Sequence, residues 1–126
     1  MNMVELSKSI TNRTSIRDGR EKIATDALIK HSLTLPYATL HIDGVELVKP
    51  GTSDMYAVFT FKELPTSFWN GCKIATEIAA LWLESFHGDT LALLEQINEQ
   101  HIGFKLSTQI SQKGRPYTAV VVVSQC

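Results

Sequence analysis

Apolar and polar residues alternate along two stretches of the chain, the period of a β-strand with one buried face. Residues 38–42 alternate first, followed by the turn dipeptide Asp43-Gly44 and by extended residues 45–48. This segment is either a small hairpin or one bulged strand. The second stretch, residues 55–62, places Phe59 on an apolar face.

The period changes to that of a helix over residues 67–100. The tripeptide Pro65-Thr66-Ser67 predicts a helix start with Thr66 or Ser67 as the N-cap. Apolar positions then recur at helical spacing: Ile74, Ile78, Leu81 and Trp82. Gly88 interrupts this pattern and ends the first predicted helix.

A second helix follows in the sequence. Asp89 is its predicted N-cap, because an aspartate carboxylate accepts hydrogen bonds from free backbone N–H groups. Its apolar residues share one face: Leu91, Leu94 and Ile97. Gly103 follows its last turn.

Residues 102–124 predict a β-hairpin. Apolar and polar positions alternate over residues 104–111, and residues 112–116 supply a turn in which Gly114 tolerates positive φ. The returning residues 117–123 are apolar on both faces, which predicts a more central strand.

The N-terminal region is the least regular part of the chain. Residues 1–19 are polar and basic and predict a flexible arm, so the expected single domain is residues 20–126. Within it, Lys22-Ile23-Ala24 is a candidate strand and Thr25 a candidate cap of a short helical turn, which ends before Pro36.

These elements predict an α+β domain. Their order is three strands, a helical region and two strands, with the first strand placed near residues 20–24. That order fits an OB-like five-stranded barrel with one or two helices inserted before the C-terminal β-hairpin. An open antiparallel sheet with helices on one face fits equally well.

The composition is that of an average globular domain. The chain has 126 residues, of which 44% are hydrophobic and 20% charged. No apolar run reaches the roughly 18 residues of a membrane span. We expect no membrane partner, and the absence of a signal-peptide pattern at the N-terminus favours a cytoplasmic location.

The net charge of −1 divides unevenly along the chain. Residues 1–35 hold six basic and four acidic side chains, and residues 36–104 hold three basic and nine acidic ones. Residues 105–126 hold three basic side chains and no acidic one. If the two ends lie together in the fold, they form one positive face.

Catalytic and metal-binding motifs are absent from the sequence. It has no Gly-rich phosphate loop, HExxH or GxSxG motif, and Cys72 and Cys126 form no CxxC pair. We expect no metal, no cofactor and no enzymatic activity, and interpret Glu63 as a solvated strand end. An unrecognised enzyme would have to use these ionisable residues: His41, Glu46, Asp54 and His101.

Single-stranded nucleic acid is bound by aromatic rings that stack on bases and by basic side chains that contact phosphates. Five aromatic residues lie in apolar patterns and predict a core: Phe59, Phe61, Trp69, Trp82 and Phe104. The remaining candidates predict a binding site for single-stranded DNA: Arg17, Arg20, Lys22, Tyr56, Lys62, Lys105, Lys113, Arg115 and Tyr117.

Residues 105–122 combine a polar strand, a charged turn with Gly114, Tyr117 and a valine-rich strand. This stretch resembles the last hairpin of OB-fold single-stranded-DNA-binding proteins. Residues 61–71 resemble segments of small phage and mobile-element proteins of Gram-positive bacteria. The resemblance implies ssDNA binding and a homo-oligomer, although residues 123–126 lack the acidic tail with which such proteins recruit partners.

The alternative hypothesis is a protein-interaction, adaptor or inhibitor protein. It predicts an apolar surface patch on the helices of residues 67–100 or on the valine-rich strand, with acidic residues around it. The sequence pI of about 6.4 argues against a tight binder of duplex DNA, because duplex affinity depends on neutralising phosphates.

Overall fold

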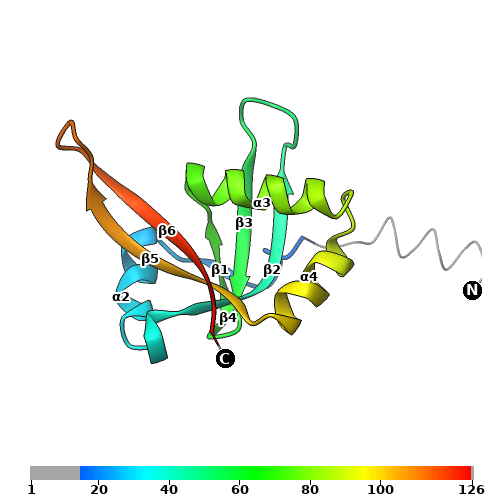
Figure 1. Ribbon diagram of the computed structural model, residues 1–126, viewed down its shortest axis with the longest axis horizontal. Coiled ribbons are helices and arrows are strands. Elements are labelled where there is room, and N and C mark those ends of the chain that lie inside the picture. Colours follow the sequence, from blue (N-terminus) through cyan, green and yellow to red (C-terminus); the bar gives the residue numbers. More distant parts are fainter. Residues whose placement is uncertain (1–14, 126) are drawn as a thin grey trace, which may run out of the picture.

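Six strands form one mixed sheet in the computed structural model, which describes residues 15–125, and three α-helices pack with it (Figure 1). The strands are β1 (Glu21–Lys22), β2 (Leu40–Val48), β3 (Tyr56–Phe61), β4 (Leu64–Asn70), β5 (Ile102–Ile110) and β6 (Pro116–Ser124). The helices are α2 (Thr25–Ser32), α3 (Lys73–Ser85) and α4 (Thr90–Glu99), with a short 3₁₀ turn η1 (Pro36–Ala38). The predicted α+β class is confirmed, and two helices precede the C-terminal hairpin.

The strand order across the sheet is β1-β4-β3-β2-β5-β6. All neighbours are antiparallel except β1 and β4, which are parallel. Strand β2 is shared between two partners: Leu40 and His41 pair with β5, whereas residues 42–48 pair with β3. The sheet does not close, so a closed antiparallel barrel is not the architecture of the described residues.

The segment around Asp43-Gly44 is one bulged strand rather than a hairpin. The register of β2 against β3 shifts between Ile42 and Gly44. A Cβ atom on Gly44 would lie 2.7 Å from the Thr60 hydroxyl oxygen, closer than real Cβ atoms approach other groups. The glycine therefore permits close packing of two strands rather than a turn.

The predicted helix start at Thr66 or Ser67 is wrong, because these residues lie in strand β4. The helix begins at Lys73, and its N-cap residue Cys72 makes no side-chain capping bond. Pairing with β3 overrides the local Pro-Thr-Ser signal. It places Trp69, only 1% exposed, opposite Phe59 in the register.

The N-terminal elements also differ from expectation. The candidate strand at residues 22–24 is a two-residue strand, β1, at the edge beside β4. Helix α2 does start at Thr25, but its N-cap is Ala24. The Thr25 hydroxyl accepts a hydrogen bond from the Trp69 indole nitrogen at 3.0 Å instead. The third antiparallel strand before the helices is therefore β4, which the sequence pattern did not predict.

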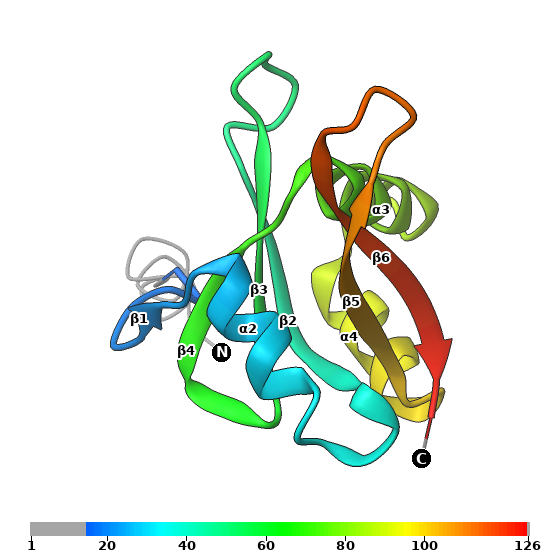
Figure 2. The same ribbon diagram turned by 90° about the vertical axis from the view of Figure 1, so that its left-hand side faces the viewer.

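Helix α2 lies between β4 and the β5–β6 hairpin, on the side where the sheet remains open (Figure 2). Thr25 bonds to Trp69 of β4, and the helix also contacts β5. Leu28 of α2 is fully buried in the core. In a closed barrel, β4 and β6 would pair and cover the core at this position. Here they do not pair, and α2 covers the core instead.

The core is built around four aromatic rings, as predicted. Phe59 has ring-centroid distances of 5.8 Å to Trp69 and 5.1 Å to Phe104, and Phe61 lies beside them. These four side chains are at most 1% exposed. Trp82 of α3 is half-buried and stacks on Phe104 at 6.0 Å.

The buried faces of the two helices are rotated from the predicted stripes. Helix α3 buries Ala75 and Ala79, whereas Leu81 is 63% exposed. Helix α4 buries Leu93 and Ile97, whereas Leu91 is 76% exposed. Small residues let α3 approach the sheet closely, so its large apolar side chains lie partly on the surface.

Strand β6 is an edge strand, although its apolar residues on both faces predicted a central one. Val121 and Val122 are 54% and 41% exposed.

Asp89 caps α4 as expected, because its carboxylate accepts a hydrogen bond from the backbone N–H of Ala92 at 3.1 Å. Within residues 15–125 no helix has the length and apolarity needed to span a membrane.

Candidate nucleic-acid interface

Four of the predicted binding residues lie together on the β5–β6 hairpin. Lys113 and Arg115 are exposed in its turn, Tyr117 is 45% exposed just after it, and Lys105 is half-buried further along β5. The two strands keep an unbroken antiparallel register from Ile102–Ser124 to Ile110–Pro116. This hairpin projects from the rest of the molecule (Figure 2).

The hairpin turn is fixed by local hydrogen bonds. The backbone N–H of Ser111 donates to the carbonyl oxygen of Arg115 at 2.8 Å, and the N–H of Gly114 donates to that of Ser111 at 2.9 Å. Gly114 has a φ of 78°, a conformation that glycine adopts without strain. The turn thus holds Lys113 and Arg115 at the exposed tip.

Lys105 and Tyr117 share the outer face of the hairpin. Cross-strand partners share a face, and Lys105 pairs with Val121 while Gln109 pairs with Tyr117. The amide nitrogen of Gln109 donates to the Ser107 hydroxyl at 3.1 Å on the same face. The outer face therefore combines an aromatic ring, a lysine and hydrogen-bonding side chains.

Arg17 and Tyr56 do not join this surface. A guanidinium nitrogen of Arg17 donates to the Tyr56 hydroxyl at 3.2 Å, and its Nε donates to the Ser15 hydroxyl at 3.1 Å. Ser15 in turn donates to the Glu46 carboxylate at 2.6 Å. Both predicted residues hold the segment after residue 14 against the sheet, and both are half-buried.

The other predicted basic residues lie elsewhere. Arg20 donates to the carbonyl oxygens of Pro65 at 3.1 Å and Ile16 at 2.6 Å, and Lys22 is exposed on β1. Lys62 lies in the β3–β4 turn and donates to the Asn98 side chain. Strands β1 and β6 are opposite edges of the sheet, so the described basic residues of the two ends do not form one continuous face.

The charge of the described chain is nevertheless polarised. Residues 102–125 carry Lys105, Lys113 and Arg115 and no carboxylate side chain. Residues 73–99, which hold α3 and α4, carry five carboxylates and one lysine. The hairpin therefore carries a net positive charge and the two helices a net negative charge.

His41, Glu63 and Gln125 form a polar cluster that the sequence pattern does not predict. The Glu63 carboxylate accepts hydrogen bonds from the His41 backbone N–H and lies against Nδ1 of its ring, both at 2.7 Å. The other ring nitrogen of His41 contacts the carbonyl oxygen of Gln125. Glu63 is thus a structural residue and not the solvated strand end that was expected.

Replacing Glu63 with alanine is expected to lower the free energy of unfolding by about 1–3 kcal/mol, because two partly buried donors on His41 lose their acceptor. Both side chains are 21% exposed. Urea unfolding followed by tryptophan fluorescence measures the change. The matched control is Glu99→Ala on the exposed side of α4. Equal losses in the two variants would show that the cluster adds no stability.

The candidate catalytic residues do not converge. His41 bonds to Glu63, Glu46 bonds to Ser15, and Asp54 lies exposed in the loop between β2 and β3. Among residues 15–125, no three His, Cys, Asp or Glu side chains lie close enough together to hold a metal ion. The described part of the chain therefore does not bring these four types of side chain together in one cluster.

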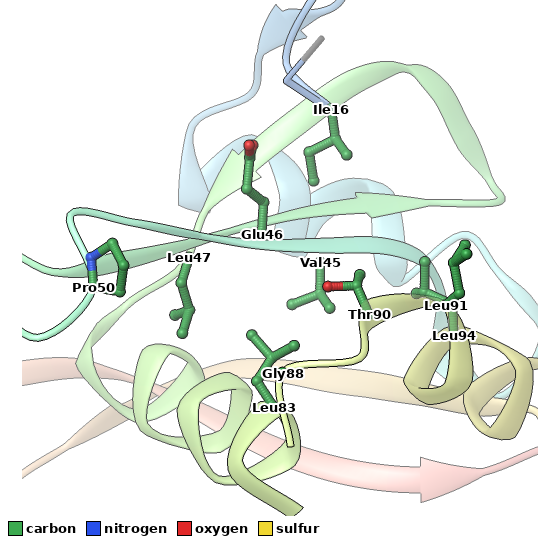
Figure 3. Close-up of a pocket in the computed structure, with 10 residues that line it drawn as sticks. All are labelled: Ile16, Val45, Glu46, Leu47, Pro50, Leu83, Gly88, Thr90, Leu91 and Leu94. Atoms are coloured by element: carbon green, nitrogen blue, oxygen red, sulfur yellow. The ribbon is translucent and has the colours of Figure 1, made fainter. Parts of the chain in front are cut away.

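A second surface feature is an open cavity of about 620 Å³ between β2 and the helices, here named the β2–α4 groove. Its lining residues (Figure 3) are mostly apolar and come from β2, α3, α4 and the adjoining segments: Ile16, Val45, Glu46, Leu47, Pro50, Leu83, Gly88, Thr90, Leu91 and Leu94. Helical periodicity predicts Leu91 and Leu94 on the buried face of α4, so the sequence pattern does not indicate a groove.

Comparison with known proteins finds no relative of the chain. No protein-family model matches the chain, and neither a curated protein nor a solved structure matches it. Function is therefore inferred from the geometry of the chain itself.

Proposed function

We propose that the protein binds single-stranded nucleic acid, specifically ssDNA, without catalysis, on the outer face of the β5–β6 hairpin. The observation that carries this proposal is the exposed ring of Tyr117 on a projecting hairpin whose charged side chains are all basic. An exposed aromatic face stacks on a base of any identity, and lysine or arginine at the tip contacts phosphates.

The strand order supports the same proposal. An OB-fold binds oligonucleotides between the loop joining its first two strands and the loop joining its last two. With β2 counted as the first strand, these loops are residues 49–55 and 111–115, which lie at the same end of the molecule (Figures 1 and 2). We therefore propose an OB-like arrangement that is open between β4 and β6.

Of the two predicted tyrosines, the proposed site keeps Tyr117 and omits Tyr56. Residues 15–17 contact the face of β2 and β3 that carries Glu46 and Tyr56, and the Tyr56 hydroxyl is bonded to Arg17. Tyr117 is the more exposed of the two tyrosines and the one we assign to base stacking.

The test is a fluorescence anisotropy titration with a labelled oligo-dT of about 30 nucleotides at two salt concentrations. We expect micromolar binding that weakens as salt rises. The Tyr117→Ala variant is expected to bind about tenfold more weakly, because one stacked base contributes about 1–3 kcal/mol. Arg115→Ala is expected to reduce the slope of log affinity against log salt concentration by the amount that corresponds to about one phosphate contact.

Matched controls come from surfaces away from the hairpin. Tyr37→Ala removes a ring that is 67% exposed after α2, and Lys30→Ala removes an exposed charge on α2. Both should retain the affinity of the unmodified chain. Absence of binding at low salt would overturn the proposal, as would equal losses in Tyr117→Ala and Tyr37→Ala.

A further inference from the structure

The two edges of the sheet differ in how well they are protected against pairing with another chain. Strand β1 has two residues, and both are charged. Strand β6 has nine residues and keeps a regular register with β5 throughout. Edge strands usually avoid pairing through short length, charges, prolines or bulges. Beyond Pro116 at its first position, β6 has none of these features.

The side chains of β6 fit a strand that has a neighbour on each side. Val121 and Val122 point to opposite faces of the sheet, and both are more than 40% exposed. Apolar residues on both faces are typical of strands inside a sheet. Within residues 15–125, β6 has a neighbour only on the side of β5. An additional strand beside β6 would cover part of both valine side chains.

The hydrogen bonds at the two ends of β6 show which residues face outward. The N–H of Ser111 donates to the carbonyl oxygen of Arg115, and the N–H of Gln125 donates to that of His101. Residues bonded to a given neighbour alternate with outward-facing residues along an antiparallel strand. The odd-numbered residues of β6 therefore bond to β5. The even-numbered residues direct their backbone N–H and C=O groups to the outer edge.

A second copy of the chain fits this edge in an antiparallel arrangement. When all nine residues of two β6 strands overlap, Val120 lies opposite Val120 of the second copy and Thr118 lies opposite its Val122. These residues face outward in both copies, as interstrand bonding requires. Because residues 117–124 carry no charged side chain, no like charges meet across the pair. The edge is thus complementary to itself about a two-fold axis.

We propose that the protein forms a two-fold symmetric dimer by antiparallel pairing of β6 with β6 of a second copy. The pairing joins the two sheets into one and makes β6 a central strand. The assembly closes after two copies, because the same edge of each copy is used. The proposal is independent of ssDNA binding and is tested without nucleic acid.

The first test is sedimentation velocity of the full chain at rising protein concentration, with a reducing agent to exclude dimers linked through cysteine. We expect a reversible change from the mass of one chain, 14.0 kDa, to twice that mass. Hydrogen exchange then locates the interface. The outward-facing amides of Thr118, Val120 and Val122 should gain protection as the dimer forms. The amides of Ala119 and Val121, which bond to β5 in either state, should change much less.

Two variants of β6 test the pairing in different ways. Val122→Pro removes an outward N–H that β5 does not use, and edge strands tolerate proline at such positions. It should weaken dimerisation at least about tenfold, because the dimer loses two hydrogen bonds between the chains. Val121→Lys keeps the backbone groups and adds one charge to each copy, with an expected loss of about tenfold. The matched control, Leu91→Lys, changes an exposed apolar residue of α4 and should leave dimerisation unchanged.

Several results would overturn the proposal. The first is a chain that keeps the mass of one copy at every concentration. The second is a dimer in which the even-numbered amides of β6 gain no protection, which would place the interface elsewhere. Assemblies larger than a dimer, or equal losses in Val121→Lys and Leu91→Lys, would likewise contradict a closed β6 pair.

Discussion

Replacing Phe59 with alanine is expected to lower the free energy of unfolding by about 3–5 kcal/mol, the largest stability loss we expect from a single substitution. The ring is fully buried and contacts Phe61, Trp69 and Phe104, so its removal leaves a cavity at the centre of the core. A domain of this size has about 5–15 kcal/mol of stability in total, so a large fraction is lost.

Urea unfolding monitored by circular dichroism measures this loss. Phe59→Leu should cost less, because leucine fills part of the space. Tyr37→Ala, which removes an exposed ring, should leave the midpoint almost unchanged. A loss below about 1 kcal/mol for Phe59→Ala would mean that the four rings do not form the packed centre described above.

Gly103→Val is expected to destabilise the protein by about 3 kcal/mol or more and to separate the hairpin from β2. A Cβ atom on Gly103 would lie 2.6 Å from the carbonyl oxygen of Leu40 and 2.8 Å from the Thr39 methyl group. The first of these atoms is backbone and cannot rotate away. The site is also critical because only Leu40 and His41 of β2 pair with β5 among the described residues.

The measurement combines thermal unfolding with hydrogen exchange. Gly103→Val should lose amide protection at residues 40–41 and 103–104 before it loses protection in β3. Ser107→Val is the control, since it adds the same side chain to the same face of β5, further along the hairpin. If both valine variants are equally stable, the close approach of Gly103 to the carbonyl oxygen of Leu40 does not restrict the size of the side chain at position 103.

The sequence predicted those elements whose local pattern and tertiary role agree. The alternation in residues 55–62 and in the C-terminal hairpin produced strands at nearly the predicted positions. Asp89 capped α4 because a capping bond depends only on neighbours in the chain. The aromatic core was predictable because large apolar rings in a regular apolar pattern are usually buried.

The errors arose where distant contacts decide the structure. Residues 64–70 carry a helix-start signal, but pairing with β3 makes them a strand. The valine-rich β6 has the composition of a central strand, yet its position in the sheet depends on how β5 attaches to β2. The face of α4 toward the sheet likewise depends on packing, so Leu91 was assigned to the core and is exposed.

The candidate sites were predictable to different degrees. Lys113, Arg115 and Tyr117 came together because a hairpin is local in sequence. Arg17 and Tyr56 bond to each other across the fold, which no local pattern indicates. The pairing of His41 with Glu63 joins distant parts of the chain in the same way, so no local pattern indicates it either.

Because β2 has two partners, the two halves of the sheet form at different entropic costs during folding. Its pairing with β3 closes a loop of a few residues, and the β5–β6 hairpin also closes a short loop. The pairing of Leu40 with Phe104 joins distant parts of the chain, and the cost of closing a loop rises with its length. Helices α3 and α4 lie between these two strands in sequence, so their formation shortens the intervening chain and lowers that cost.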